Sequence, residues 1–336
     1  MASLKDVAKL AAVSLMTVSR AINNPERLRP DTLARVQQAI DQLHYVPDFS
    51  ARKIRDRQSV PPAIGVLALD TATTPFSVEL LLSLEKTAQQ HGWTTFVINL
   101  FEHQDAQQAV DKLLSLRPAG IVFTTMGLRR ITLPARLRDK PLVLANCLSD
   151  DAPVASYVPD DVDGQYQATR ALIARGYRRP LCIHLPVCTL AGRRRRAGFE
   201  QAWREAGLPL PAQQYHLALG DNHYLDTVSL LAAHLPQGRP DFDVLVCGND
   251  RVAFVAYQYL LGQGIRIPAD VAVLGYDNMV GIGELFYPAL TTVQLPHLAI
   301  GREAALHIIE QRPHREVCAL PSPLLARASV GVKHTA

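Results

Sequence analysis

The chain has 336 residues and a formal net charge of +4 at pH 7, and 48% of its residues are hydrophobic. It has no apolar N-terminal segment of the kind that directs secretion, and no apolar run reaches the roughly eighteen residues of a membrane span. We therefore expect a cytoplasmic protein that has no membrane partner.

Cysteines and histidines give no sign of a metal centre. The five cysteines are scattered, odd in number and mostly placed in strand-like runs, where a small thiol packs well. No pair of histidines has the spacing of metal ligands, and no GxGxxG, Walker or GxSxG motif is present. We expect no disulfide, no metal site, no cofactor and no catalytic residues, so the chain is not expected to be an enzyme.

The positive charge is concentrated at the N-terminal end. The first 58 residues hold ten Lys or Arg and six Asp or Glu, whereas the remaining residues hold 25 of each sign. An excess confined to one small region favours contacts with the phosphates of nucleic acid, although a nucleic-acid coat protein would be far more basic.

Residues 3–24 predict two short helices joined by a tight turn. Ser3 can cap the first helix, with Asp6 three residues on, and Ser14 can cap a second helix that begins near Leu15. The apolar residues spaced to pack the two helices together are Val7, Leu10, Val13, Val18 and Ile22. The polar, long side chains of the second helix then face outward, as in a helix that enters a DNA major groove.

A third helix is predicted after Pro30, which suits a first helical position. Its apolar stripe is Leu33, Val36, Ile40 and Leu43. Three short helices form a compact head, and the helix pattern alone would also suit an ordinary small bundle.

Residues 46–62 form a polar and basic linker. Its centre, FSARKIRD, has the length of about two helical turns and is too short to be stable by itself in water. It could become ordered against DNA and a second copy, with Ile54 inserted between base steps of the minor groove. A flexible tether is the alternative interpretation.

Strand-like and helical patterns alternate from Ala63 onward. Buried-strand runs are expected at residues 63–70, 95–101, 120–126, 141–147, 180–186, 243–250 and 270–278. Helices are expected at residues 78–90, 104–116, 165–174, 197–206, 252–261 and 299–311. This alternation predicts an α/β body with parallel sheets. Its length favours two lobes, with a ligand cleft between them at the carboxyl ends of the strands.

Three segments resemble the lactose-repressor (LacI/GalR) family of bacterial transcription regulators. They are DVAKLAAVSLMTVSRAINN in the head, YVPDFSARKI in the linker, and GNDRVAFVAYQYLLGQGIRIPADVAVLGYDN followed by PALTTVQLP in the body. The resemblance covers essentially the whole chain. It implies a helix-turn-helix DNA-binding head at residues 1–45, a hinge helix and linker at 46–62, and a two-lobed, periplasmic-binding-protein-like domain for effector binding and dimerisation at 63–336.

The same resemblance implies a homodimer that binds near-palindromic operator DNA and is released by a small sugar in the cleft. Segments such as DTATTPFSVELL, TTMGLR and PLCIHLP are similar to those of members that control sucrose utilisation, which favours sucrose as the effector. Fructose, another sugar or a nucleobase corepressor are the alternatives. A sugar-transport binding protein would instead require an export signal and no head. The chain has no leucine heptads after PLLARASV, so a dimer is expected rather than a tetramer.

Residues of the head take roles from their positions in the family pattern. Leu15, Met16 and Arg20 correspond to the base-reading positions. Arginine can pair with guanine through two hydrogen bonds, whereas leucine and methionine offer only apolar contacts, for example to a thymine methyl group. The remaining implied DNA contacts are Ser3, Ser14, Thr17, Ser19, Asn23, Arg29 and Thr32 in the head, with Ala51 and Ile54 in the hinge.

Sugar-binding roles are likewise implied for Arg195, Asn249 and Asp277. Further effector-site candidates are Phe76, Asn146, Asp221 and Tyr224. Charged and amide groups can pair with adjacent hydroxyls, and an aromatic ring can cover the apolar face of a sugar. Helix capping is the alternative role for Asn249 and Asp277. The arginines next to Arg195 are expected to be solvated.

The chain departs from the family pattern at three positions. Ala12 stands where glycine is usual, which costs roughly 1 kcal/mol if the turn requires a positive φ. Arg29 replaces a helix-capping serine, and Ile54 replaces the usual hinge leucine. We expect a lost cap at Arg29 and a β-branched wedge at Ile54.

Overall fold

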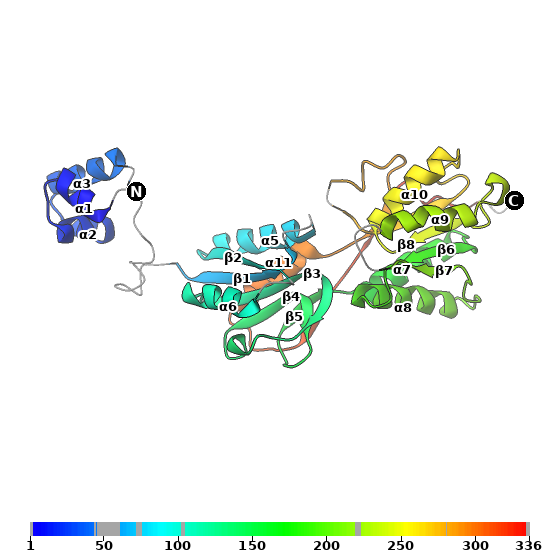
Figure 1. The fold of residues 1–336 in the computed structure, drawn as a ribbon, viewed down its shortest axis with the longest axis horizontal. Coiled ribbons are helices and arrows are strands. Elements are labelled where there is room, and N and C mark those ends of the chain that lie inside the picture. Colours follow the sequence, from blue (N-terminus) through cyan, green and yellow to red (C-terminus); the bar gives the residue numbers. More distant parts are fainter. Residues whose placement is uncertain are drawn as a thin grey trace. The chain divides into compact units, whose positions relative to one another are not determined.

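The computed structural model describes residues 3–43, 45, 61–71, 76–101, 105–218, 223–279 and 281–333, without the side chains of Asn23 and Phe76. The chain divides into two compact units, Met1–Pro61 and Pro62–Ala336 (Figure 1). The predicted hinge contacts Ala51 and Ile54 and the effector candidate Asp221 lie outside the described residues. Within the described part of the chain, no helix is long and apolar enough to span a membrane.

The first unit contains a three-helix head. Its elements are α1 (Leu4–Leu10), α2 (Leu15–Asn23), the 3₁₀ turn η1 (Pro25–Arg27) and α3 (Pro30–Gln42). Val7, Val18 and Val36 are fully buried at its centre. The prediction that Leu10 packs between the helices was wrong, because its side chain is 46% exposed. Ala11 lies one turn after Val7 on the inner face of the chain and is buried instead.

The second unit contains two six-stranded sheets. The first sheet has the order β11-β5-β4-β3-β1-β2, and all its recorded pairings are parallel. Its strands are β1 (Ala63–Leu69), β2 (Thr94–Leu100), β3 (Gly120–Ile131), β4 (Leu142–Ser149), β5 (Ser156–Pro159) and β11 (Val317–Leu320). The helices packed with it are α5 (Phe76–Gln90), α6 (Ala106–Ser115) and α11 (His297–Ile309), and η3 (Ala135–Leu137) joins β3 to β4. We call this sheet and its helices lobe 1.

The second sheet has the order β12-β10-β9-β8-β6-β7, with β12 antiparallel to β10. Its strands are β6 (Pro180–His184), β7 (Gln214–His216), β8 (Val244–Cys247), β9 (Ala272–Asp277), β10 (Thr291–Gln294) and β12 (Leu324–Leu325). Its helical elements are α7 (Asp161–Ala174), α8 (Leu190–Glu205), η4 (His223–Leu225), α9 (Asp226–Ala233), η5 (Pro236–Gly238) and α10 (Asp250–Gly262). We call this sheet and its helices lobe 2.

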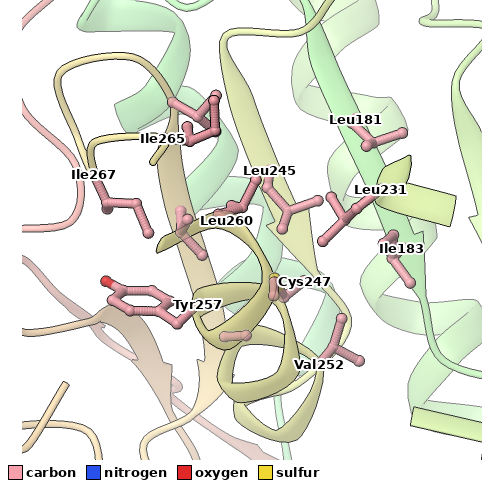
Figure 2. Close-up of a cluster of buried hydrophobic side chains, with 14 of the residues drawn as sticks. Leu181, Ile183, Leu231, Leu245, Cys247, Val252, Tyr257, Leu260, Ile265 and Ile267 are labelled. Carbon is pink, nitrogen blue, oxygen red and sulfur yellow. The ribbon is translucent and has the colours of Figure 1, made fainter. Parts of the chain in front are cut away.

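Alternate residues of the lobe 2 strands face opposite helical layers. Leu181, Ile183 and Leu245 pack with α10 and α9, as Figure 2 shows around Val252 and Leu260. Their neighbours Cys182, Val244 and Val246 pack on the other face, against α7 and α8. This two-sided burial explains why the strand sequences are continuous apolar runs instead of alternating ones.

Helices α7 and α8 approach each other closely because α8 carries a glycine at their contact. A Cβ atom on Gly198 would lie 2.1 Å from the carbonyl oxygen of Val162 in α7. The backbone contact brings the middle of α8 against the start of α7.

Three connections join the lobes. The chain passes from β5 to α7, returns from β10 to α11, and passes again from β11 to β12. The predicted strands are present, whereas the short strands β5, β7, β10, β11 and β12 and the helix α9 were not anticipated. Helix α8 begins at Leu190 instead of residue 197, because its first turns are rich in arginine and hide the apolar pattern.

Candidate nucleic-acid interface and ligand cleft

Side-chain caps fix both helices of the helix-turn-helix. The Ser3 hydroxyl accepts a hydrogen bond from the Asp6 backbone N–H (3.3 Å), and the Ser3 N–H donates to Asp6 Oδ2 (2.8 Å). The Ser3 hydroxyl also lies 2.6 Å from Asp6 Oδ2, and this side-chain hydrogen bond, followed by that from the Ser3 N–H, lowers the pKa of Asp6. Ser14 Oγ accepts from the Thr17 backbone N–H at 3.1 Å and lies 2.9 Å from the Thr17 hydroxyl. The two predicted caps are therefore present, and each holds the start of a helix.

The predicted base-reading residues lie on the exposed side of α2. Leu15 is 42% exposed and Met16 is 66% exposed, so two adjacent large apolar side chains are available for contact at the start of α2. Arg20, one turn after Met16, places Nη2 3.8 Å from the Met16 sulfur. The three side chains therefore form one face in which a planar cation adjoins apolar groups. Thr17 and Ser19 are partly buried beside this face.

The two departures in the head have the predicted local consequences. Ala12 has a φ of 52°, the left-handed conformation that favours glycine. Arg29 is the N-cap residue of α3 and makes no capping hydrogen bond with its side chain. Its exposed guanidinium and the partly buried Thr32 lie at the start of α3, where phosphate contacts are predicted.

A cavity of about 880 Å³ opens in the second unit and is lined by residues of both lobes. This volume lies within the range of sites that bury small ligands. The candidates Asn146, Arg195, Tyr224, Asn249 and Asp277 all line it. Phe76 begins α5, but its side chain is outside the described set.

Arg195 is the central charged group of the cavity. It is 6% exposed, and its Nε donates to Asp161 Oδ1 (2.9 Å). Its Nη1 donates to the Gly248 carbonyl (2.8 Å) and to Asp277 Oδ1 (3.0 Å). The guanidinium carbon lies 3.7 Å from the centre of the Tyr276 ring. Among the described residues, Nη2 has no hydrogen-bond partner. It is also not buried away from the cavity. Nη2 is therefore free to donate to a ligand.

Asp277 offers an acceptor beside that donor. Its Oδ1 is held by Arg195, whereas Oδ2 has no hydrogen bond with the described residues and is not enclosed. Burial raises the pKa of Asp277 to about 7, against the opposing effect of Arg195. Its φ of 113° is strained for a residue with a side chain, and such strain is common where a side chain must face a ligand.

Asn249 and Asn146 add amide groups to the cavity wall. Asn249 caps α10, accepting from the Val252 backbone N–H at 3.0 Å, and its Nδ2 donates to the Tyr224 hydroxyl at 3.2 Å. Asn249 therefore both caps α10 and forms part of the cavity wall. Asn146 has a φ of 59°, and its Nδ2 donates to the Thr125 carbonyl at 3.2 Å.

Several cavity residues were missed from the sequence. Asp161 and His297 line the cavity, and Tyr276 lies under the Arg195 guanidinium. Arg193 also lines the cavity, but it is exposed, as expected for the neighbours of Arg195, and its guanidinium donates to the carbonyls of Val187 and Cys188. Asp161 is the second residue after the short strand β5. If β5 had been recognised, its carboxyl end would have indicated Asp161 as a residue of the ligand site.

Comparison with known proteins agrees with this architecture. The model of the periplasmic binding proteins and sugar binding domain of the LacI family matches residues 61–328, and the model of the bacterial regulatory proteins of the lacI family matches residues 3–48. The chain belongs to the LacI family of transcription regulators. The expectation of a regulator, and not an enzyme, is therefore confirmed.

Within the LacI family, the chain is a homologue of sucrose operon repressors. It is 59% identical over 330 residues to those of Shigella flexneri and Escherichia coli, covering 98% of this chain and 100% of each relative. The structure of the lac repressor dimer bound to operator and the anti-inducer ONPF superposes with a TM-score of 0.77, at 23% identity and 98% coverage of both chains. This structural likeness concerns the fold, which matches the predicted helical head and two-lobed α/β body.

Proposed function

We propose that this LacI-family repressor controls a sucrose-utilisation operon and leaves its operator when a sugar, sucrose first among the candidates, binds in the cavity. The observation that carries the proposal is that two hydrogen-bonded side chains in the cavity wall, Arg195 and Asp277, each keep one polar atom available: Nη2 is a donor and Oδ2 is an acceptor. Two adjacent sugar hydroxyls can satisfy both groups at once. The names of the relatives that share 59% of its residues support the choice of sucrose.

The charges around the cavity favour a neutral ligand. Five arginines and two aspartates line it. Two of these arginines have carboxylate partners of their own, since Arg129 pairs with Asp70 and Arg130 with Asp150, each at 3.3 Å. The two aspartates and these ion pairs offset much of the arginines' positive charge, which leaves a weak basis for binding a phosphorylated sugar. Fructose and a nucleobase corepressor remain the alternative neutral effectors.

The cavity assignments follow from this proposal. Arg195, Asp277, Asn249 and Asn146 would bind hydroxyls, and Tyr224 would cover an apolar sugar face. Phe76 and Asp221 stay predictions. In the head, Leu15, Met16 and Arg20 would read bases, while Ser3, Ser14, Thr17, Ser19, Asn23, Arg29 and Thr32 would contact or support contacts to phosphates.

A homodimer is proposed for operator binding. The lac repressor structure of the same fold is a dimer on its operator. Large apolar side chains of the body that stay exposed are a second support, among them Phe254 (49%), Leu285 (79%) and Tyr287 (90%). With a palindromic operator the expected stoichiometry is two chains per duplex.

Operator binding measured by fluorescence anisotropy tests the proposal. Palindromic and single half-site duplexes are titrated at fixed salt, without ligand and with sucrose, fructose, glucose or hypoxanthine. Sucrose is expected to weaken binding to the palindrome. Asp277→Asn is expected to bind operator normally and to lose the response, whereas Asp111→Asn, an exposed carboxylate in α6, keeps it. Specific binding that no sugar alters would refute the effector assignment.

A further inference from the structure

Arg195 lies where the three connections between the lobes come together. Asp161, which accepts from Arg195 Nε, is the first residue of α7 and lies on the connection from β5. Asp277, the second carboxylate on Arg195, accepts a hydrogen bond through its backbone carbonyl from the Leu295 N–H (3.3 Å) on the connection from β10 to α11.

The third connection reaches Arg195 through Tyr276. The ring of Tyr276 lies under the guanidinium at 3.7 Å. A Cβ atom on Gly164 of α7 would be 2.8 Å from both the Tyr276 hydroxyl and the Ser322 Cβ, so the hydroxyl adjoins Ser322. Ser322 is on the connection from β11 to β12. Each connection therefore contacts Arg195 directly or through one residue.

Asp161 makes the most deeply buried of these contacts with Arg195. It is fully buried, and its ion pair with Arg195 joins two side chains that are 7% and 0% exposed. Its Oδ2 is enclosed and has no hydrogen-bond partner in the described part of the chain. A buried carboxylate with an unpaired oxygen is costly, and the adjacent guanidinium is what offsets that cost.

A role in starting α7 does not account for Asp161. Asp160 is the N-cap of that helix, and its side chain accepts from the Asp163 backbone N–H at 3.0 Å. The helix start is thus capped without Asp161. The partner that the Asp161 carboxylate does have is the arginine of the cavity.

We propose that Asp161 is a positioning residue that transmits occupation of the cavity to the lobe connections. It holds Nε so that Nη2 faces the ligand, and it links the guanidinium to the connection between β5 and α7. The inference rests on the proposed function of the cavity as a sugar site. A ligand shifts a conformational equilibrium only through contacts that differ between the two states. A sugar hydroxyl that accepts a hydrogen bond from Nη2 alters the geometry of the Arg195–Asp161 ion pair. This change is a contact that differs between the two states.

The test compares Asp161→Asn with Asp163→Asn in the full-length protein. Both substitutions remove one negative charge from the first turn of α7, but Asp163 is exposed and does not line the cavity. Sucrose affinity is measured by calorimetry, and operator affinity by anisotropy with and without saturating sucrose. We expect Asp161→Asn to bind operator without sucrose as the wild type does, to bind sucrose roughly tenfold more weakly, and to lose most of the release. Asp163→Asn should match the wild type.

Two results would overturn the inference. One is wild-type sucrose affinity and release in Asp161→Asn. The other is a loss of thermal stability and operator binding with an unchanged ratio of operator affinities with and without sucrose, which a merely structural role would produce. If Asp161→Asn does not fold, Asp161→Glu keeps the buried charge but displaces Arg195, and release at wild-type level in this variant also overturns the inference. A wild-type protein that ignores sucrose and fructose would instead refute the proposed function.

Discussion

Ala12 carries a conformational cost that a single substitution removes. Its φ of 52° is unfavourable for a residue with a Cβ atom and free of that penalty for glycine. We expect Ala12→Gly to stabilise the head by about 0.5–1 kcal/mol, the relief of strain being partly offset by the greater entropy of glycine in the unfolded chain. Calorimetric melting of the full-length protein would measure the head transition.

Ala34→Gly is the matched control for this substitution. Ala34 is an exposed residue in the interior of α3, so glycine there should destabilise the head by about 1 kcal/mol. If glycine stabilises the head at position 12 and destabilises it at position 34, the backbone conformation of Ala12 is the cause of the gain in stability. A lower melting temperature in both variants would contradict this assignment of strain.

His297 makes the stability of the body depend on pH. Burial, followed by the positive charge of Arg195, lowers the pKa of His297 to about 4, compared with about 6.5 in an unfolded chain. Between these values the unfolded chain binds a proton that the folded chain does not. The folded state therefore loses stability as the pH falls from about 7 to 4, by up to about 3 kcal/mol from this residue.

Replacing the imidazole separates this contribution from other titrations. His297→Gln cannot bind the proton, so its free energy of unfolding should fall less steeply between pH 7 and pH 4 than that of the wild type. Denaturant unfolding at several pH values measures the slope. Equal slopes for the two proteins would show that His297 titrates normally in the folded state.

At the scale of elements, the start of α8 joins the two lobes by apolar contact. Leu190 packs against Leu128, Leu148 and Val158, which lie in β3, β4 and β5 of lobe 1. The three lobe 1 residues are buried, and Leu190 and Leu128 also line the cavity. One end of α8 is thus fixed to lobe 1, while the rest of the helix packs on α7.

We expect Leu190→Ala to lower the free energy of unfolding of the body by about 1–2 kcal/mol, less than a fully buried leucine because Leu190 is only partly buried. Urea unfolding measures the change. Leu210→Ala removes the same atoms from a side chain that is 44% exposed and should change the free energy by less than about 0.5 kcal/mol. Equal effects at both positions would rule out a specific contact between α8 and lobe 1.

Most elements and the residues at which they begin could be predicted from patterns of neighbouring residues. The caps at Ser3 and Ser14, the missing cap at Arg29 and the conformation of Ala12 each depend on a few neighbouring residues, and these features follow directly from the sequence. The longer strands were also predictable as continuous apolar runs. Short strands such as β5 were not, because their four or fewer residues do not lie in a longer apolar run as those of β8 do.

The cavity was only partly predictable for the same reason. Asn249 and Asp277 lie at the ends of the long apolar runs 243–250 and 270–278, and this pattern could be recognised. Asp161 follows the unrecognised β5, and its contact with Arg195 joins residues that are 34 positions apart. Tyr276 was hidden within an apolar strand, since nothing in the sequence indicates that its ring lies under a guanidinium. Contacts of this kind depend on tertiary packing.

At the level of the whole molecule, the proposed function links two sites that lie on separate units. The head presents Leu15, Met16 and Arg20, and the body offers Arg195 and Asp277 to a sugar. If sucrose weakens operator binding by some factor, operator DNA must weaken sucrose binding by the same factor. This reciprocity holds whatever the path of coupling within the molecule.

Calorimetric titration of sucrose into the repressor, free and saturated with its operator, measures this reciprocal effect. We predict a higher Kd for sucrose on the operator complex, raised by the same factor by which saturating sucrose raises the Kd for the operator. An identical sucrose Kd in the two titrations would contradict the account, because the cavity would then bind sugar without any effect on DNA binding.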